Sequence, residues 1–322
     1  MEVDKKRILI RGLTANPKYI PSWYIYDETG SKLHHIFATE NPNYYLTESQ
    51  VSVLQNNIQE IIPRLPYEIK LVDLGCGNCS KTRHIIDDIL KRQHQLSFYP
   101  VDVSEDFLMT SARELKEEYG DSLLLSPIAK DYIRAIEELK KVEGPKIILW
   151  IGSISNLTYT DQVTILRMIS TMMSDKCRLL FSADITQDKE AIIKAYNDDT
   201  GLTREFIQNA AVRLNKETGS QIDLARFTYE VDFICDKTPQ SLSYVRAYIK
   251  AKESIQDPIP GLGIDLVIEK GGRLYFHEGD GFSNKYTLEQ LRNIVEKSGL
   301  QLADSWTDDQ KHAVFCSCTT AT

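Results

Sequence analysis

A regular alternation of apolar runs and amphipathic runs between residues 70 and 184 is the feature that most constrains the fold. The runs IKLVDLG, LSFYPVDVS, SLLLSPIA, KIILWIG and CRLLFSAD have the composition of buried strands, and residues with helical periodicity fill the intervals between them. Strands that alternate with helices of this length form βαβ units, which build a mostly parallel sheet covered by helices on both faces. The sequence therefore predicts an α/β fold.

The same pattern returns near the C-terminus after a long interruption. Thr287 and Gln290 predict a capping box, Gly299 predicts the end of that helix, and QLADSWT with KHAVFCSCT predicts a closing hairpin. About a hundred residues separate Asp184 from Thr287, whereas connections in compact domains are about 2–12 residues long. We therefore expect an inserted α+β domain, helical at first and then rich in strands, with Gly271-Gly272 turning its last two strands.

The predicted domain boundaries follow from this interruption. Residues 57–186 and 287–322 are expected to form the core with the parallel sheet. Residues 1–56 and 187–286 are expected to form the second domain, in which the partly helical and aromatic N-terminal segment packs on the insertion as a lid.

Charge and hydropathy exclude several classes of partner. The net charge of −8 gives no basic surface for a phosphate backbone, so we expect no nucleic-acid partner. No apolar run reaches the roughly 18–20 residues of a membrane span, and the polar start MEVDKKRILIRG lacks the apolar core of a signal peptide. The expectation is a cytoplasmic protein that is a monomer or weak dimer, takes a small-molecule substrate and does not bind a membrane.

The stretch LVDLGCGNCSKT has two interpretations: half of a zinc or redox site built from Cys76 and Cys79, or a nucleotide cradle built from Gly75 and Gly77. A structural zinc site needs a second ligand pair. The other close pair, Cys316 and Cys318, has the spacing of one face of a strand. The sequence therefore favours the glycine cradle, with no metal. Core packing is the expected role of the remaining two cysteines, Cys177 and Cys235.

The ligand of the cradle follows from the acidic residues at the ends of successive strands. Asp102 ends the second strand, where a carboxylate can accept both hydroxyls of a ribose. Ser80 stands where a pyrophosphate-binding loop has its third glycine, so an adenosine ligand without phosphates is favoured. Asp131 is expected to bond the adenine amino group and Tyr132 to stack on the ring, although Asp131 also has the sequence context of a helix cap. Together with Asp73, these positions indicate S-adenosylmethionine (SAM).

Seven motifs then resemble, in order along the chain, the histidine-specific SAM-dependent methyltransferases. They are GLTANPKYIPSWYIYDETGSKL, NPNYYLTES, LVDLGCGNCSKTRHII, YPVDVS, IGSISNLT, AYNDDTGLTREFIQN and FSNKYT. This family trimethylates the α-amino group of histidine in the ergothioneine pathway, and it includes fungal N-methyltransferases of tryptophan and dimethylallyltryptophan. The resemblance implies a Rossmann-like class I methyltransferase core and a substrate-binding domain made of the N-terminal helices and the insertion.

The resemblance also assigns residues to the site. It places Gly75, Lys81, Asp102, Asp131 and Tyr132 around SAM, and the cradle argument adds Gly77 to this cofactor set. Tyr44, Asn156 and Tyr196 match the positions that bind the substrate carboxylate, and Tyr26 matches the tyrosine near the reacting amine. Uncharged phenol and amide donors suit this task because they bind a carboxylate without introducing a competing nucleophile.

The pocket for the substrate side chain departs from the pattern. Members that bind histidine carry a glutamate two residues before a serine; here the serine is Ser283, but the glutamate position is Gly281. The dimethylallyltryptophan enzymes also have a small residue there. Glu278 or Asp280 is an alternative partner for an imidazole, unless both are solvated turn residues. His34, where the family has an aromatic residue, is either a group that orients or deprotonates the amine or an ordinary lid residue.

The resulting hypothesis is a SAM-dependent N-methyltransferase acting on the α-amino group of a free amino acid with a ring side chain, L-histidine being the family default. An indole amino acid such as tryptophan or a prenylated tryptophan is the alternative substrate. A non-catalytic SAM-binding protein is a rival from another class, and the apparent clamp for a substrate carboxylate argues against it. A nucleic-acid methyltransferase is disfavoured because IGSISNLT follows the fourth strand in place of an Asp/Asn-Pro-Pro-aromatic motif.

Overall fold

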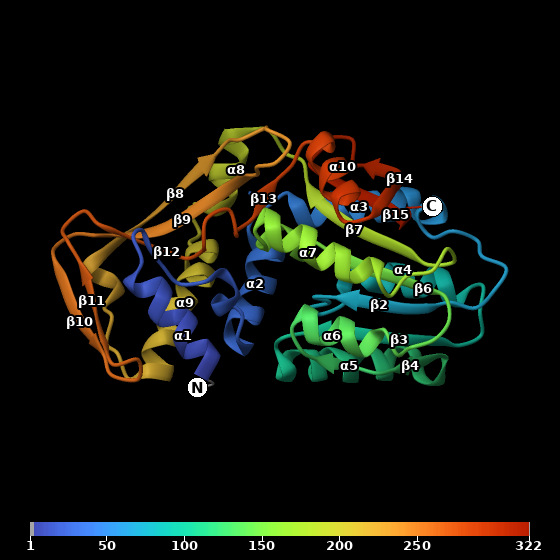
Figure 1. Cartoon of the computed structure of the whole chain (residues 1–322), viewed down its shortest axis with the longest axis horizontal. Helices are drawn as coiled ribbons and strands as arrows, with labels where there is room; N and C mark the ends of the chain where they lie inside the picture. Colours follow the sequence, from blue (N-terminus) through green and yellow to red (C-terminus); the bar gives the residue numbers. More distant parts are fainter. Residues whose placement is uncertain (1–2, 322) are drawn as a thin grey trace. The chain divides into compact units, whose positions relative to one another are not determined.

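The computed structural model describes residues 3–321, and these residues form two compact units (Figure 1). Unit 1 comprises residues 1–44, 188–235 and 243–284, of which residues 3–44 are described at the N-terminus. Unit 2 comprises residues 45–187, 236–242 and 285–322, described as far as residue 321. No helix within residues 3–321 is long and apolar enough to cross a lipid bilayer.

Unit 2 contains the α/β pattern that the sequence predicted. In chain order its elements are α3 (Leu46–Ile61), β2 (Lys70–Leu74), α4 (Ser80–Leu90), β3 (Leu96–Asp102), α5 (Glu105–Tyr119), η2 (Gly120–Ser122), β4 (Leu123–Leu125), β5 (Ile128–Ala129), α6 (Tyr132–Leu139), β6 (Lys146–Ile151), η3 (Ser153–Asn156), α7 (Tyr159–Ser170), β7 (Arg178–Asp184), α10 (Leu288–Lys297), β14 (Leu300–Thr307) and β15 (Ala313–Thr320).

The strands of unit 2 form one mostly parallel sheet in the order β4-β3-β2-β6-β7-β15-β14. The pairs from β4 to β7 are parallel, and β15 is antiparallel to β7 and to β14. The chain moves from β2 to β3 on one side and later to β6 on the other. This reversal creates a topological switch point, where open α/β sheets bind ligands at the carboxyl ends of the strands.

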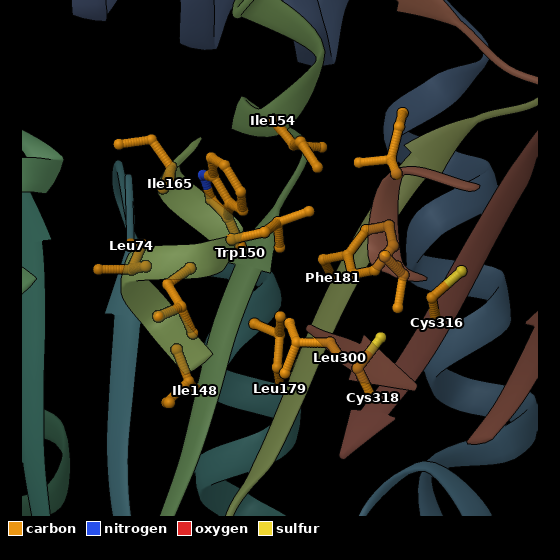
Figure 2. Close-up of a cluster of buried hydrophobic side chains, with 14 of the residues drawn as sticks. Leu74, Ile148, Trp150, Ile154, Ile165, Leu179, Phe181, Leu300, Cys316 and Cys318 are labelled. Atoms are coloured by element: carbon orange, nitrogen blue, oxygen red, sulfur yellow. The ribbon is translucent and has the colours of Figure 1, made fainter. Parts of the chain in front are cut away.

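Apolar side chains fill both faces of this sheet. On one face, residues of β2, β6, β7 and β15 pack against α6, α7 and α10, with Trp150 and Phe181 fully buried (Figure 2). Strand residues of the opposite parity, such as Leu71 and Leu180, are fully buried on the other face, because successive side chains alternate across a strand. Burial on both faces explains why the strand runs are almost continuously apolar.

Unit 1 contains the N-terminal helices and the insertion. In chain order its elements are α1 (Val3–Thr14), β1 (Lys18–Tyr19), η1 (Ser22–Ile25), α2 (Glu28–Glu40), α8 (Lys189–Tyr196), α9 (Leu202–Thr218), η4 (Leu224–Arg226), β8 (Phe227–Ile234), β9 (Ser243–Ala251), β10 (Ile255–Ile259), β11 (Ile264–Ile268) and β12 (Arg273–Tyr275). Strand β13 (Asn284–Lys285) follows at the boundary with unit 2. Within unit 1, α2 and η1 contact α9, and β9 lies between β8 and β12.

Two details of the expected organisation differ in the structure. The predicted boundary at residue 56 falls inside α3, which belongs to unit 2 because it packs on α4 and β15. The prediction that Gly271-Gly272 joins two paired strands is wrong: β11 pairs with β10, and β12 pairs with β9 and β1. The strand β10 had not been predicted, because its proline and polar residues hide the strand pattern.

Candidate functional site

The loop after β2 approaches its neighbours too closely for any residue larger than glycine. Gly75 has a φ of +74°, and a Cβ there would lie 2.7 Å from Ser153 Oγ and 3.0 Å from the Tyr132 hydroxyl. The backbone N–H groups of Gly75 and Cys76 donate to the carbonyl of Val101, at 2.9 and 3.0 Å. The loop is therefore fixed against the end of β3, with its backbone open to a close ligand.

Asp102 completes this loop from the end of β3. Its Oδ2 accepts a hydrogen bond from the N–H of Gly77 at 3.1 Å, and its Oδ1 accepts one from the N–H of Ser104 at 3.0 Å. Burial raises the pKa of the half-buried Asp102 carboxyl, whereas the backbone hydrogen bonds from Ser104 and Gly77 lower it. Each carboxylate oxygen keeps a second lone pair, so the group can still accept hydroxyls from a ligand.

A second carboxyl group lies under the loop. Asp73 is only 2% exposed; its Oδ2 accepts a bond from the Thr82 hydroxyl, while its Oδ1 has no hydrogen-bond partner among residues 3–321. Burial raises the pKa of Asp73 to about 7. Burial also lowers the pKa of the half-buried Lys81 ammonium, although the nearby charge of Asp73 opposes this. An incompletely paired buried carboxyl of this kind can respond to a cationic ligand.

The two predicted adenine-binding residues differ in their surroundings. Asp131 is exposed and caps α6, accepting a bond from the N–H of Arg134 at 2.9 Å, so its contacts are those of the helix-cap alternative. Tyr132 is half-buried and packs edge-on against Trp150, with ring centroids 5.6 Å apart. Sequence analysis missed Val103 and Ile133, whose apolar side chains are 55% and 52% exposed directly after Asp102 and Tyr132.

The cysteines have mostly structural surroundings. Cys76 and Cys79 are buried in the loop, and the neighbouring Cys79 thiol, followed by burial, raises the pKa of the Cys76 thiol. Cys316 and Cys318 are fully buried on one face of β15, as predicted. The prediction that Cys235 packs in a core is wrong, because β8 ends at residue 234 and this thiol is exposed.

In unit 1, the predicted amine-binding residues lie at one end of a row of rings. The rings of Tyr26 and His34 are 5.7 Å apart, and both contact Phe206 of α9, at 5.5 and 5.2 Å. Phe37, one turn after His34, stacks on Phe206 at 5.2 Å. The structure thus brings Tyr26 and His34 together around two phenylalanines that sequence analysis missed.

The same row continues to the predicted carboxylate-binding tyrosines. Phe37 contacts Tyr44 at 4.5 Å, and Tyr44 contacts Tyr196 at 6.0 Å. The hydroxyls of Tyr196 and Ser283 form a short hydrogen bond, and the ring of Tyr196 contacts Phe282 at 6.1 Å. Ser283 has a φ of +43°, an uncommon backbone conformation for serine. Strained residues of this kind cluster at functional sites. Tyr44, Tyr196 and Ser283 are therefore neighbours in unit 1.

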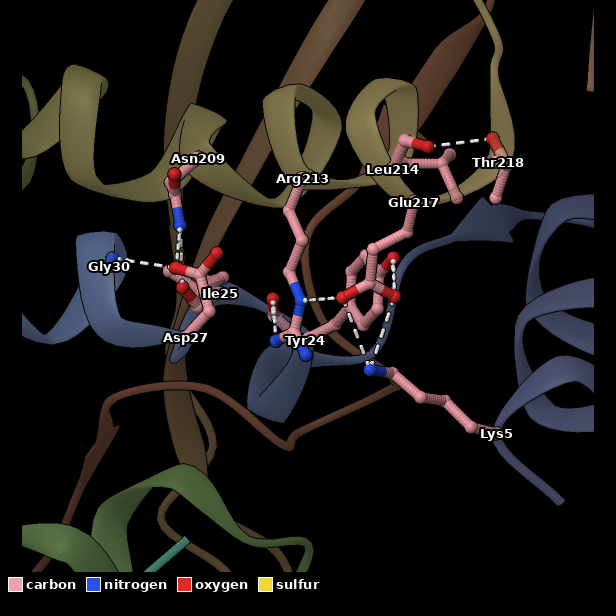
Figure 3. Close-up of polar contacts among 10 residues, drawn as sticks. All are labelled: Lys5, Tyr24, Ile25, Asp27, Gly30, Asn209, Arg213, Leu214, Glu217 and Thr218. Carbon is pink, nitrogen blue, oxygen red and sulfur yellow. Dashed lines mark hydrogen bonds and ion pairs between the residues drawn. The ribbon is translucent and has the colours of Figure 1, made fainter. Parts of the chain in front are cut away.

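Buried amides fix the backbone that carries these rings. Asn209 of α9 donates to the Ile25 carbonyl at 2.9 Å and to the Asp27 carboxylate at 2.8 Å, on either side of Tyr26 (Figure 3). Asp27 also caps α2 by accepting from the N–H of Gly30 at 2.8 Å. A Cβ at Gly30 would lie 1.8 Å from the Ile25 carbonyl oxygen, so this turn requires glycine.

A matching amide supports the other end of the row. The side chain of Asn41 donates to the Ala195 carbonyl at 2.9 Å and to the Thr203 hydroxyl at 3.1 Å. It thereby ties the segment before Tyr44 to the end of the helix that carries Tyr196. Sequence analysis assigned no role to Asn41 or Asn209. These contacts show that both asparagines fix the backbone next to the row of rings.

Gly281 occupies the position of the missing glutamate, and of the two acidic residues near it, Glu278 and Asp280, the first is bound to other side chains. Gly281 is buried, and its N–H donates to the carbonyl of Glu278 at 2.9 Å. The exposed Glu278 carboxylate accepts from the Tyr19 hydroxyl at 2.9 Å and lies 3.6 Å from the Arg11 guanidinium. Asp280 is half-buried. Burial of Tyr244 raises the pKa of its hydroxyl, and the negative charge of Asp280 raises it further.

Unit 2 contains Asn156 and a buried ion pair. Asn156 is half-buried at the end of η3, the turn that follows β6. Lys285, two residues after Ser283, is fully buried and lies 2.9 Å from the carboxylate of Asp184, which is 1% exposed. The Tyr45 hydroxyl and the N–H of Thr186 also donate to this carboxylate, at 3.1 and 2.9 Å. The pair therefore fixes β13 in register with the end of β7.

Comparison with known proteins identifies the family. The family model described as "Histidine-specific methyltransferase, SAM-dependent" matches residues 5–320. The histidine N-alpha-methyltransferase of Mycolicibacterium smegmatis is 25% identical over 94% of this chain and 91% of its own. The N-methyltransferase benX of Aspergillus terreus is 30% identical over 94% of this chain and 85% of its own.

A solved structure resembles the chain more remotely. It is a SAM-dependent methyltransferase from Clostridium acetobutylicum, with a TM-score of 0.45 at 9% identity over 91% of this chain and 99% of that one. The family match spans nearly the whole chain, including the glycine loop after β2 and the tyrosines of unit 1. The chain therefore belongs to the histidine-specific SAM-dependent methyltransferase family and is a SAM-dependent methyltransferase.

Proposed function

We propose that this enzyme methylates the α-amino group of a free amino acid with a ring side chain, with L-histidine as the first substrate to test. The observation that supports this most is the row of rings and hydroxyls in unit 1, where Tyr44, Tyr196 and Ser283 are neighbours. Neutral hydroxyl donors beside aromatic rings suit a small zwitterion whose carboxylate needs donors and whose ring needs apolar contact. The family relationship supports the same substrate class.

The residues of unit 2 fit the cofactor. The Gly75 cradle would be filled by a Cβ, and the exposed side chains of Val103 and Ile133 offer apolar contact for an adenine. We assign the ribose to Asp102, the adenine edge to Asp131, and the remaining contacts to Gly77, Lys81 and Tyr132. The incompletely paired Asp73 carboxyl would balance part of the ligand's positive charge. SAM, when bound, supplies an electrophilic methyl group.

The residues of unit 1 are assigned to the amino acid. Tyr44 and Tyr196, together with Asn156 of unit 2, would donate hydrogen bonds to the substrate carboxylate. Tyr26 and His34 would orient the amine, which must be neutral to act as a nucleophile, and His34 would accept the proton that the amine loses. Most of the rate enhancement would come from holding the amine in line with the methyl group while excluding water.

Variants of Asp102 and Asn156 test the cofactor assignment and the substrate assignment separately, and a variant of Asp131 is the comparison for Asp102. Asp102→Ala should abolish SAM binding measured by calorimetry, whereas Asp131→Ala, which alters an exposed helix cap, should weaken it much less. Retained SAM binding by Asp102→Ala would contradict the ribose assignment. Asn156→Ala should raise the KM for the amino acid at least about tenfold while leaving the KM for SAM nearly unchanged, as expected for loss of hydrogen bonds to a charged group.

An indole amino acid is the second candidate, and a specific observation favours it. The glutamate position is occupied by the buried Gly281, which leaves more space, and Glu278 bonds Tyr19 instead of turning inward. Mass spectrometry of reactions with histidine, tryptophan and dimethylallyltryptophan distinguishes the two candidates. A mass increase of about 14, 28 or 42 units on one of them identifies the substrate and the number of methyl groups.

A further inference from the structure

His277 is a buried titratable group in unit 1 to which the proposed reaction gives no role. It is 3% exposed, and its Nδ1 lies 2.9 Å from the carbonyl oxygen of Gly279. A carbonyl oxygen can only accept, so Nδ1 must carry a proton. Burial lowers the pKa of His277 to about 4, so the imidazole is neutral at neutral pH and has no second proton. Its Nε2 is therefore a hydrogen-bond acceptor.

This acceptor is buried without a donor. No hydrogen-bond partner for Nε2 occurs within residues 3–321. Leaving a buried acceptor unpaired costs free energy, and most such groups in native proteins have a partner or a function. A donor supplied by a ligand would remove this cost.

The surroundings of His277 connect it to the proposed substrate site. Its ring lies 5.7 Å from the ring of Tyr244 and 5.9 Å from that of Tyr275. It stacks on Phe282 at 5.9 Å with 19° between the ring planes. Phe282 in turn contacts Tyr196 and precedes Ser283. His277 is thus one ring beyond the tyrosines assigned to the substrate carboxylate.

The other polar groups near this position are committed only in part. Arg246, whose charge helps to keep the imidazole neutral, donates through its Nη2 to the Asp232 carboxylate at 2.8 Å, whereas its buried Nε has no hydrogen-bond partner among residues 3–321. Glu278 is exposed and accepts from Tyr19. The position where histidine-binding relatives are expected to carry an acceptor is Gly281, which has no side chain. A neutral imidazole can supply an acceptor here without burying a charge.

We propose that Nε2 of His277 accepts a hydrogen bond from a ring N–H of the substrate and thereby selects amino acids whose ring carries such a group, imidazole or indole. This inference rests on the proposed function and adds a determinant of specificity to it. Because Nε2 is covered in the free protein, Phe282, which stacks on the imidazole, is the side chain expected to move when the ring enters.

Shape-matched ligands without the N–H test the inference. Calorimetry on the full chain, with S-adenosylhomocysteine present to prevent turnover, would compare L-tryptophan with 3-benzothienyl-L-alanine and L-histidine with 4-thiazolyl-L-alanine. In at least one pair the wild type should prefer the N–H ligand by about ten- to a hundredfold. His277→Phe should abolish this preference, His277→Gln should keep part of it through its amide oxygen, and the control Tyr275→Phe should keep all of it.

Each outcome separates the inference from the proposed function. Equal binding of both members of the pairs by the wild type, or an undiminished preference in a folded His277→Phe variant, overturns the role of His277 alone. If His277→Phe fails to fold, His277→Gln carries the test: a smaller preference than that of the wild type, with the preference of Tyr275→Phe unchanged, supports the inference, and an undiminished preference in His277→Gln overturns it. If neither pair binds and no amine is methylated, the proposed function fails and the inference fails with it.

Discussion

The two compact units are stabilised by different kinds of contact. In unit 2, apolar side chains from six strands and the helices α6, α7 and α10 form one continuous cluster in which Trp150 and Phe181 are fully buried (Figure 2). In unit 1, the contacts that tie α9 to the N-terminal segment include charged and amide groups. The carboxylate of Glu217 lies 2.7 Å from the Nε of Arg213 and 3.2 Å from the Nζ of Lys5. It also accepts a hydrogen bond from the Tyr24 hydroxyl at 3.0 Å (Figure 3).

This difference indicates which unit tolerates substitutions. Apolar packing is non-directional, so a core keeps its fold when hydrophobic residues of similar volume are exchanged. Directional hydrogen bonds at Asn209 and Glu217 specify where η1 and the start of α2 lie on α9. Tyr26 directly follows η1, and α2 carries His34. Unit 2 thus provides a tolerant scaffold for the groups assigned to the cofactor, whereas unit 1 fixes the groups assigned to the substrate by particular polar contacts.

The largest predicted effect runs against this division into an apolar unit 2 and a polar unit 1, because it concerns the fully buried ion pair between Lys285 and Asp184 in unit 2. Lys285→Met should lower the free energy of unfolding by about 3–5 kcal/mol, since it leaves the carboxylate of Asp184 buried without its cation. Denaturant unfolding measures this. The double variant Lys285→Met/Asp184→Leu should recover most of the loss, and a single variant that loses less than about 1 kcal/mol would contradict the buried pair.

The next predicted effect is a pH dependence of stability that comes from His277, a buried titratable group of unit 1. The pKa of His277 falls from 6.5 to about 4 on burial, so between these values the unfolded chain binds a proton that the folded chain does not. Acidification from pH 7 to pH 4 should therefore cost about 3 kcal/mol of stability through this residue. His277→Phe should lose correspondingly less stability over that range, measured by urea unfolding at both pH values. An identical pH dependence in both proteins would refute a neutral, buried imidazole.

How far the sequence predicts the structure also differs between the units. Strands β2, β3, β6 and β7 lie where apolar runs predicted them, because burial on both faces leaves a local pattern. In unit 1 the order of the insertion, helical first and then rich in strands, was also predicted, and α8, α9, β8 and β9 follow that order. The pairing of β11 and β12 was not, because partners in an antiparallel sheet depend on contacts far along the chain.

The candidate site divides in the same way. The proximity of Gly77 to Asp102 follows from the order of parallel strands, so the sequence predicts it. The contacts of Phe206 with His34 and Phe37 join residues about 170 positions apart, and no local pattern specifies them. One signal was available: Phe206, Asn209 and Arg213 recur at helical spacing on one face of α9, which indicates a face that binds a partner element.

A smaller effect tests whether the polar network of unit 1 carries stability. Glu217→Gln should cost about 1–2 kcal/mol, because three donors lose a charged acceptor in a partly exposed setting. Glu205→Gln, an exposed position near the start of the same helix, is the matched control and should cost less. Equal losses in thermal unfolding would mean that the network adds nothing to the helix itself.

The smallest effect is a polar contact in unit 2 that was visible in the sequence. Thr287 accepts from the N–H of Gln290 at 3.2 Å, and the Gln290 side chain accepts from the N–H of Thr287 at 2.8 Å. Thr287→Ala should therefore cost about 1 kcal/mol, and Thr287→Ser should cost less because it keeps the hydroxyl. Chemical denaturation of the two variants checks this; equal stability of alanine and serine would exclude a capping contribution.

The most direct test of the central claim is mass spectrometry of the products formed by the purified protein with SAM and a pool of free amino acids that includes dimethylallyltryptophan. The account predicts a methylated α-amine on histidine or on an indole amino acid, and formation of that product should depend on Asp102 and Tyr196. Methylation confined to amino acids without a ring, or to a ring nitrogen in place of the α-amine, would contradict it.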